Sequence, residues 1–245
     1  MSESFRALCS DLYVNQKLTV KLDLPKSRET VLEMFERVRR QFPEMNSFRK
    51  LREELALESP QSDTPHRWLA MRNNSLRSGT VNPQTMDEAY ALHNAILKIA
   101  PSYLAVSALD VESVELLYGF DLMAPGNHDA IVFDALLAGS PLGSLLAMPG
   151  VTAMDCQPVI GIQLGTPDGI EAHFEVKTRG QRSREGEPFE PISIYLILRK
   201  SGPINAVEDL PGILSAMAQH GEELVERRLL PGLLMPIRDA IASGS

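Results

Sequence analysis

Apolar residues follow the spacing of strands and helices at the start of the chain. Every second residue of 17–24 is apolar, which predicts a strand with one buried face. Apolar residues at helical spacing then predict a helix over 27–42, ended by Pro43. We expect a second, short helical stretch over 47–57.

The next segments predict a hairpin, a helix and a strand. Residues 66–72 and 75–81 flank the pair Asn73-Asn74, which tolerates the backbone of a tight turn. Thr85 and Glu88 have the spacing of a capping box, in which each residue satisfies a backbone N–H at the start of a helix. One wholly apolar face predicts a strand over 114–122.

This order of elements predicts an α+β protein in two unequal halves. Strand, helix, hairpin, helix and strand form the ferredoxin-like βαββαβ order, which we assign to residues 1–124. A Gly/Pro/Ala-rich connector with a short helix follows over 125–150. For 151–245 we predict a second, smaller antiparallel sheet of three strands and a long C-terminal helix.

Composition indicates a folded chain in a reducing compartment. Of the 245 residues 44% are hydrophobic and 23% are charged, close to the averages for soluble domains. The first residues lack the pattern of an export signal, and prolines interrupt the longest apolar stretches, so we expect no membrane insertion. The two cysteines, Cys9 and Cys156, are far apart and lack zinc-ligand spacing, which favours reduced thiols in the cytoplasm.

Charge is distributed unevenly along the chain. The net charge is −8, and residues 78–176 hold one cationic residue, Lys98, against twelve carboxylates. An acidic segment disfavours nucleic acid, because nucleic-acid affinity comes largely from cationic side chains. The acidic segment could instead bind cations or basic protein surfaces. The alternative is that its carboxylates lie on solvated faces and only aid solubility.

The segment Gly126-Asn127-His128-Asp129 matches one element of the metallophosphoesterases, in which Asn and His help to bind two metal ions. The other elements of that family do not occur in the sequence, and Gly, Asn and Asp are turn formers. We therefore expect no metal, and keep His128 and Asp129 only as candidate binding residues.

Two further groups are candidates for binding. Glu171, His173 and Glu175 share one face of a predicted strand, where they could hold a divalent ion or form a solvated face. Arg179, Arg182 and Arg184 form a basic loop that could contact an anion or acidic partner, or be a hairpin tip. No nucleophile or phosphate-binding motif occurs, so we predict no catalytic residue and no cofactor.

The chain resembles a sporadically distributed prokaryotic family of about 250 residues without an assigned activity. The resemblance is based on Arg40-Gln-Phe-Pro43, on the strand 114–120, and on the strand 192–198 before a long terminal helix. It covers nearly the whole chain and implies no activity.

From these observations we expect a non-catalytic, cytoplasmic binding or protein-interaction protein. Its partner is another protein or a second copy, in a homodimer joined through a sheet face or edge, and not nucleic acid or a membrane. The alternative is a small-molecule-binding protein or enzyme with an apolar cavity between Phe174, Leu196 and Met217. In either case the acidic region around 125–150 is the expected place of a site.

Overall fold

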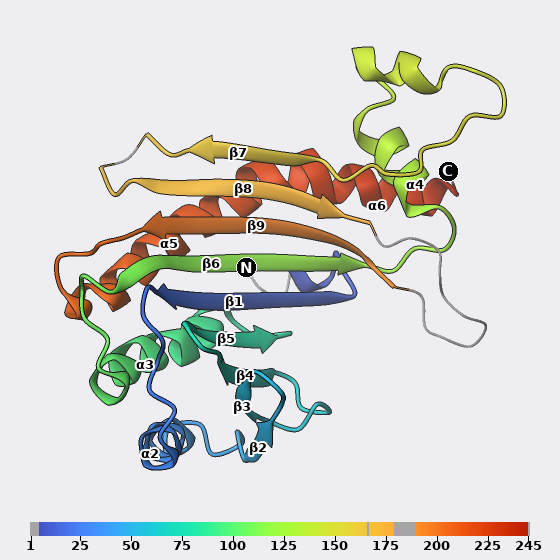
Figure 1. Ribbon diagram of the computed structural model, residues 1–245. Helices are drawn as coiled ribbons and strands as arrows, with labels where there is room; N and C mark the ends of the chain where they lie inside the picture. The colour runs from blue at the N-terminus through green and yellow to red at the C-terminus, as the bar shows by residue number, and fades with distance from the viewer. Residues whose placement is uncertain (1–4, 166, 179–189, 245) are drawn as a thin grey trace.

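The computed structural model describes residues 5–165, 167–178 and 190–244 (Figure 1). Within these residues one nine-stranded sheet has the order β2-β3-β4-β5-β1-β6-β9-β8-β7, and all neighbouring strands are antiparallel. The strands are β1 (Asp11–Val20), β2 (Ser47–Lys50), β3 (Leu55–Glu58), β4 (His66–Met71), β5 (Ser75–Val81), β6 (Val111–Leu122), β7 (Val159–Gln163), β8 (Ile170–Lys177) and β9 (Ile192–Ser201).

The single sheet corrects the prediction of a separate, smaller sheet in the second half. β9 pairs with β6 along its whole length, from Ser201 opposite Ser113 to Ile192 opposite Leu122. The three predicted strands therefore extend the sheet of the first half. Alternation along a strand identifies its buried face but not the strand that pairs with it, so the sequence did not indicate this junction. That 1–124 and 151–245 are distinct halves stays a prediction.

Helices cover one face of the sheet. They are α2 (Arg28–Arg39), α3 (Met86–Leu104), α4 (His128–Leu136), α5 (Leu210–Leu224) and α6 (Met235–Ser243), with 3-10 turns at Pro141–Leu146 and Val207–Asp209. Figure 1 shows α3, α5 and α6 behind the sheet, whereas the face of β1, β6 and β9 toward the viewer carries no helix. α2 packs against α3, and α4 packs against α6.

The predicted long C-terminal helix is present and continues past its proline. A π-helical segment, Val225–Leu234, joins α5 to α6 and contains Pro231. Proline clashes with the preceding turn of an α-helix, and π turns occur where a helix accommodates such an irregularity. The helix is therefore not broken at Pro231.

Residues 47–57 form β2 and β3, so the short helix predicted there is wrong. Ala56 and Leu57 are buried where β3 pairs with β4, opposite Ala70 and Leu69. A short apolar pattern suits either a helix or a strand, and here pairing with β4 decides between them.

The first strand has the predicted alternation but a different range. Leu12, Val14, Gln16, Leu18 and Val20 are buried under the helices, and the residues that alternate with them are half-exposed. Leu22, which we expected on the buried face, is 71% exposed because β1 ends at Val20.

Candidate functional site

The Gly126–Asp129 segment starts helix α4. Asn127 is the N-cap residue, and its side-chain oxygen accepts hydrogen bonds from the N–H groups of Asp129 (3.0 Å) and Ala130 (3.2 Å). Its amide nitrogen donates to the carbonyl of Ala153 at 2.9 Å. This segment therefore caps a helix and holds the far end of the connector.

His128 and Asp129 are both buried and both engaged in structural bonds. The Nε2–H of His128 donates to the carbonyl of Ala124 at 2.9 Å. The carboxylate of Asp129 accepts from the N–H of Cys156 (2.9 Å) and the hydroxyl of Thr178 (2.5 Å). These contacts tie α4, the connector and the end of β8 together.

Glu171, His173 and Glu175 share the open face of β8, as predicted. They are half-buried and lie opposite residues of β9, and Glu175 forms an ion pair with Lys177 at 3.3 Å. No group of three or more metal-binding side chains suited to an ion occurs in the described part of the chain. Arg179, Arg182 and Arg184 lie outside the described residues.

His173 belongs to a row of paired residues that crosses the open face of the sheet. The row, from β4 to β7, is Trp68, Gly79, Asn15, Leu117, Ile197, His173 and Gly161. At its two ends a ring lies over a glycine. A β-carbon added to Gly79 would come within 2.3 Å of Trp68, and one added to Gly161 within 3.1 Å of His173.

Polar groups of the open face pair with one another. Tyr13 donates to Asp121 at 3.2 Å and makes an edge contact with Tyr195, over which Lys177 lies at 5.5 Å. Asp121 also accepts from Ser193 at 2.7 Å. Tyr13, Asp121 and Ser193 therefore satisfy one another. Elsewhere on this face Asn15 Oδ1, Thr19 Oγ1 and Arg199 Nε are buried without a hydrogen-bond partner among the described residues.

Exposed apolar side chains are concentrated in one short stretch. Among the described residues thirteen large hydrophobic side chains are exposed, and eight of them lie between 142 and 162. These eight, which we call the apolar surface, are Leu142, Leu145, Met148, Val151, Met154, Val159, Ile160 and Ile162. Asp155 is the one charged residue in 142–162. Exposed apolar side chains gathered in this way are typical of protein interaction sites.

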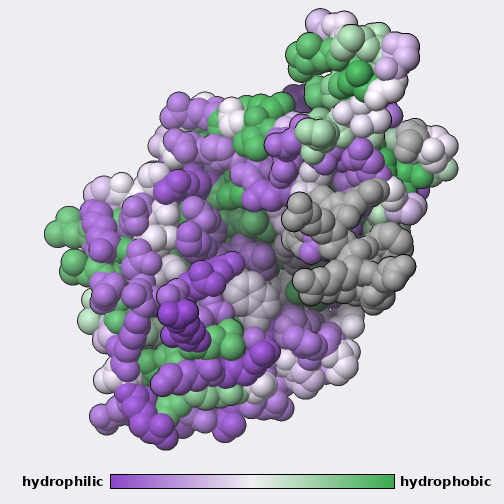
Figure 2. All heavy atoms as spheres, turned by 45° about the vertical axis from the view of Figure 1, so that its right-hand side comes forward, coloured by the Kyte–Doolittle hydropathy of each residue, from purple (hydrophilic) through white to green (hydrophobic). Residues whose placement is uncertain are grey.

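The apolar surface has two parts. Residues 142–154 form a lobe that rises past β7 in Figure 1, and Figure 2 shows this lobe as a projection from the body with many hydrophobic side chains. The second part is β7, an edge strand whose five residues are all exposed. The acidity of the sequence predicts a site in this region, but its exposed apolar side chains distinguish it.

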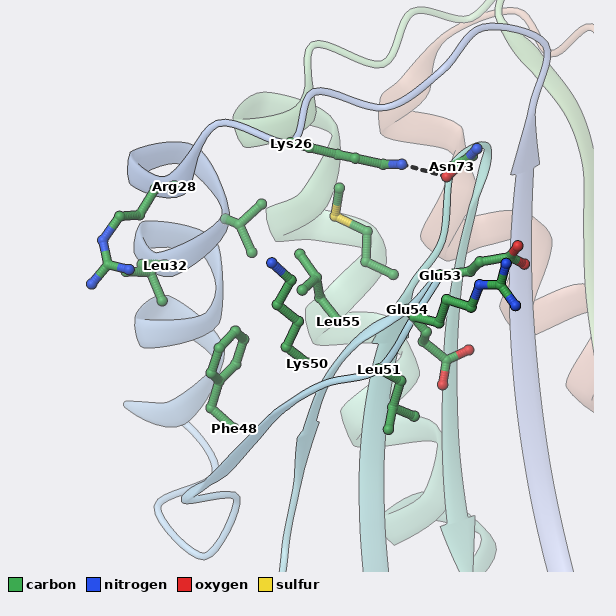
Figure 3. Close-up of a pocket in the computed structure, with 13 residues that line it drawn as sticks. Lys26, Arg28, Leu32, Phe48, Lys50, Leu51, Glu53, Glu54, Leu55 and Asn73 are labelled. Atoms are coloured by element: carbon green, nitrogen blue, oxygen red, sulfur yellow. Dashed lines mark hydrogen bonds between the residues drawn. The ribbon is translucent and has the colours of Figure 1, made fainter.

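A pocket of about 370 Å³ lies at the other end of the sheet, between α2 and the hairpin of β2 and β3 (Figure 3). Its apolar lining includes Val31, Leu32, Phe48, Leu55 and Met71. Its rim carries the cations Lys26, Arg28, Lys50 and Arg52. The pattern of 47–57 predicts a helix and therefore does not indicate this pocket. The cluster of basic residues at 49–52 was the available signal.

In the second half, the predicted cavity residues are packed. Leu196 and Met217 are completely buried and Phe174 packs against the same core. Three surface pockets border this half, of about 520 Å³ beside Ile204, about 510 Å³ between α3 and α5, and about 260 Å³ beside His220. None of them is lined by the three residues of the predicted cavity.

One buried polar cluster lies on the helix-covered face. His93 of α3 is fully buried, and its Nδ1 lies 2.8 Å from the hydroxyl of Ser78, which accepts a hydrogen bond from the side-chain amide of Gln16 at 3.2 Å. Burial lowers the pKa of His93 to about 4, so its ring is neutral in the folded chain at neutral pH. This histidine acts as a packed core residue.

Comparison with models of known protein families finds no match, and comparison with curated protein sequences finds none either. Among the described residues, no helix is long and apolar enough to cross a bilayer.

Proposed function

We propose that this chain is a non-catalytic protein-interaction protein that forms a homodimer through the edge strand β7. The observation that carries the proposal is the apolar surface, of which β7 is the strand part. An edge strand offers unpaired backbone groups to another strand, and proteins usually protect such edges with charges or proline. β7 has the sequence Val-Ile-Gly-Ile-Gln and carries neither.

The backbone of β7 is arranged to pair with one more strand. The N–H of Val176 donates to Pro158 and the N–H of Leu164 donates to Ile170 on either side of the paired stretch. Hydrogen-bonded pairs alternate along an antiparallel ladder, so the even-numbered residues of β7 bond to β8. The backbone groups of the odd-numbered residues, Val159, Gly161 and Gln163, point toward the free edge.

A second copy fits this edge because the pattern of β7 is self-complementary. With a two-fold axis at Gly161, Ile160 of each copy lies opposite Ile162 of the other, on the helix-covered side of the sheet. On the open side Val159 lies opposite Gln163, and the two glycines meet at the axis. The isoleucines thus pair with one another, Val159 pairs with the uncharged Gln163, and no charge of β7 is buried.

The opposite edge of the sheet supports the choice of β7. β2 is also fully exposed, but Arg49 and Lys50 occupy two of its four positions. Charges on an edge strand oppose pairing with a second copy. The lobe of residues 142–154 also supports β7 as the interface, because the lobe extends past β7 on the side where an added strand would lie (Figure 1).

A non-catalytic role in the cytoplasm is supported by the two cysteines, which are free. Burial raises the pKa of the Cys9 thiol to about 12, with smaller contributions from Asp11 and Asp121. Burial, together with Asp129 and Asp155, raises the pKa of Cys156 as well. Thiols of this kind are weak nucleophiles at neutral pH and suit a reducing compartment.

We also propose that the first half is a ferredoxin-like unit with an inserted hairpin. Its elements β1, α2, β4, β5, α3 and β6 follow one another in the βαββαβ order, and the four strands lie side by side as β4-β5-β1-β6. β2 and β3 extend this unit at one edge, and β9, β8 and β7 extend it at the other.

Amide hydrogen exchange tests the homodimer residue by residue. In dilute protein we expect the amides of Gly161 and Gln163 to exchange rapidly and those of Ile160 and Ile162, bonded to β8, to exchange slowly. At high concentration the odd-numbered amides should become protected, because the second copy accepts their hydrogen bonds. Odd-numbered amides that exchange rapidly at every concentration would contradict pairing through β7.

A further inference from the structure

We propose that the pocket between α2 and the β2–β3 hairpin binds a small amphipathic anion, in which an alkyl or aryl group carries a carboxylate. This site lies at the opposite end of the sheet from β7 and is independent of the homodimer (Figure 1). Its volume of about 370 Å³ lies within the range of small-molecule sites, roughly 300–1,000 Å³.

The floor of the pocket suits an apolar group. Val31 and Met71 are buried at 3% and 2% exposure, and the half-buried Leu32 and Leu55 form the walls. Phe48 stands at the side with its ring in an edge contact with Phe35 at 5.8 Å, which fixes its position. Phe48 remains 48% exposed, so an apolar ligand would cover surface that is now in contact with water.

The rim of the pocket suits an anion. Figure 3 shows Lys50 pointing into the space between α2 and the sheet, while Lys26 reaches across the top to the side chain of Asn73, to which it donates a hydrogen bond. Among the described residues, no carboxylate lies within ion-pair distance of Arg28, Lys50 or Arg52.

Two carboxylates also line the pocket, and neither neutralises the rim. Glu54 is engaged by Arg72 at 2.7 Å, and Glu53 is exposed and forms no ion pair with a described residue. Of the four cations that line the pocket, Lys50 points over the apolar floor and Lys26 spans its top, whereas the guanidinium of Arg28 points away across α2. One unengaged carboxylate, Glu53, stands against them. This arrangement favours a ligand with a negative head and an apolar body, and disfavours a cationic amphiphile of the same size.

The ligand is a soluble amphiphile rather than the surface of a membrane. The whole chain carries a net charge of −8, and an anionic bilayer would repel it. A single small anion, in contrast, enters the local field of Lys26 and Lys50.

Titration of the full chain with octanoate, followed by amide shifts in NMR spectra, tests this site. We expect octanoate to shift the amides of Val31, Phe48 and Leu55, and the octyltrimethylammonium cation to shift none of them. Lys50→Glu should weaken octanoate binding by about tenfold or more, because attraction is replaced by repulsion. Lys98→Glu, the same charge change on an exposed residue away from the pocket, should leave binding unchanged.

Three outcomes of this titration would overturn the proposal. These are no shift with octanoate, equal binding of the cationic amphiphile, and unchanged octanoate binding by a folded Lys50→Glu variant. Binding to phosphatidylglycerol vesicles through the same residues would assign the site to a membrane surface and would also overturn it. None of these results bears on pairing through β7, because no residue of β7 lines the pocket.

Discussion

The ring of Tyr118 on β6 lies directly against Gly221 on α5. A β-carbon added to Gly221 would come within 2.4 Å of this ring. The ring is 1% exposed, and its hydroxyl is bonded to the hydroxyl of Tyr90 (2.6 Å) and to the carbonyl of Ala218 (3.3 Å). Tyr118 therefore cannot move aside, and glycine is required where the long C-terminal helix crosses the sheet.

We predict that Gly221→Ala lowers the free energy of unfolding by about 1–3 kcal/mol, as is typical of overpacked cores. Gly212→Ala is the matched control, because a β-carbon there meets nothing within 4 Å. That variant should be neutral or more stable by up to about 1 kcal/mol, since alanine favours a helix over glycine. Urea denaturation measures both. If Gly221→Ala is as stable as Gly212→Ala, α5 shifts away from Tyr118 at little cost.

We predict that the buried His93 makes the fold sensitive to mild acid. Its pKa is about 4 in the folded chain and about 6.5 when unfolded, so the unfolded state takes up the proton first as the pH falls. The neutral His93 ring contributes fully to the free energy of unfolding above pH 6.5. This contribution is lost between pH 6.5 and 4, by about 1.4 kcal/mol per pH unit.

Urea denaturation at pH 7 and at pH 4.5 checks this prediction. The wild-type chain should lose about 2 kcal/mol more than His93→Gln over this interval, because the variant lacks the titrating ring while other groups titrate alike in both. The same pH dependence in both proteins would show that the ring reaches solvent or gains a partner on protonation.

Local patterns predicted most of the secondary structure. Alternation predicts the strands β1, β6, β8 and β9, and turn and capping chemistry predicts the hairpin at Asn73-Asn74 and the cap at Thr85. All of these features are present. These features depend on neighbours within a few residues, which the sequence displays directly.

The joined sheet and the two candidate sites depend on distant contacts. β6 and β9 are separated by 69 residues between Leu122 and Ile192, and no local pattern selects β9 as the partner of β6. The pocket at Phe48 needs α2, the β2–β3 hairpin and β4 together. Apolar residues at 159–163 suggest a buried strand, and only the sheet order shows that β7 is an exposed edge.

Sedimentation equilibrium of the wild-type chain, Ile160→Asp and Leu109→Asp tests the pairing of β7 most directly. Ile160 and Leu109 are both exposed, at 58% and 77%, so an aspartate at either position should leave the fold intact. We predict a mass of twice 27.1 kDa for the wild type and for Leu109→Asp, which lies outside the apolar surface, and 27.1 kDa for Ile160→Asp. A wild-type chain that stays at 27.1 kDa at every concentration, or an Ile160→Asp variant that dimerises as well as the wild type, would contradict dimerisation through β7.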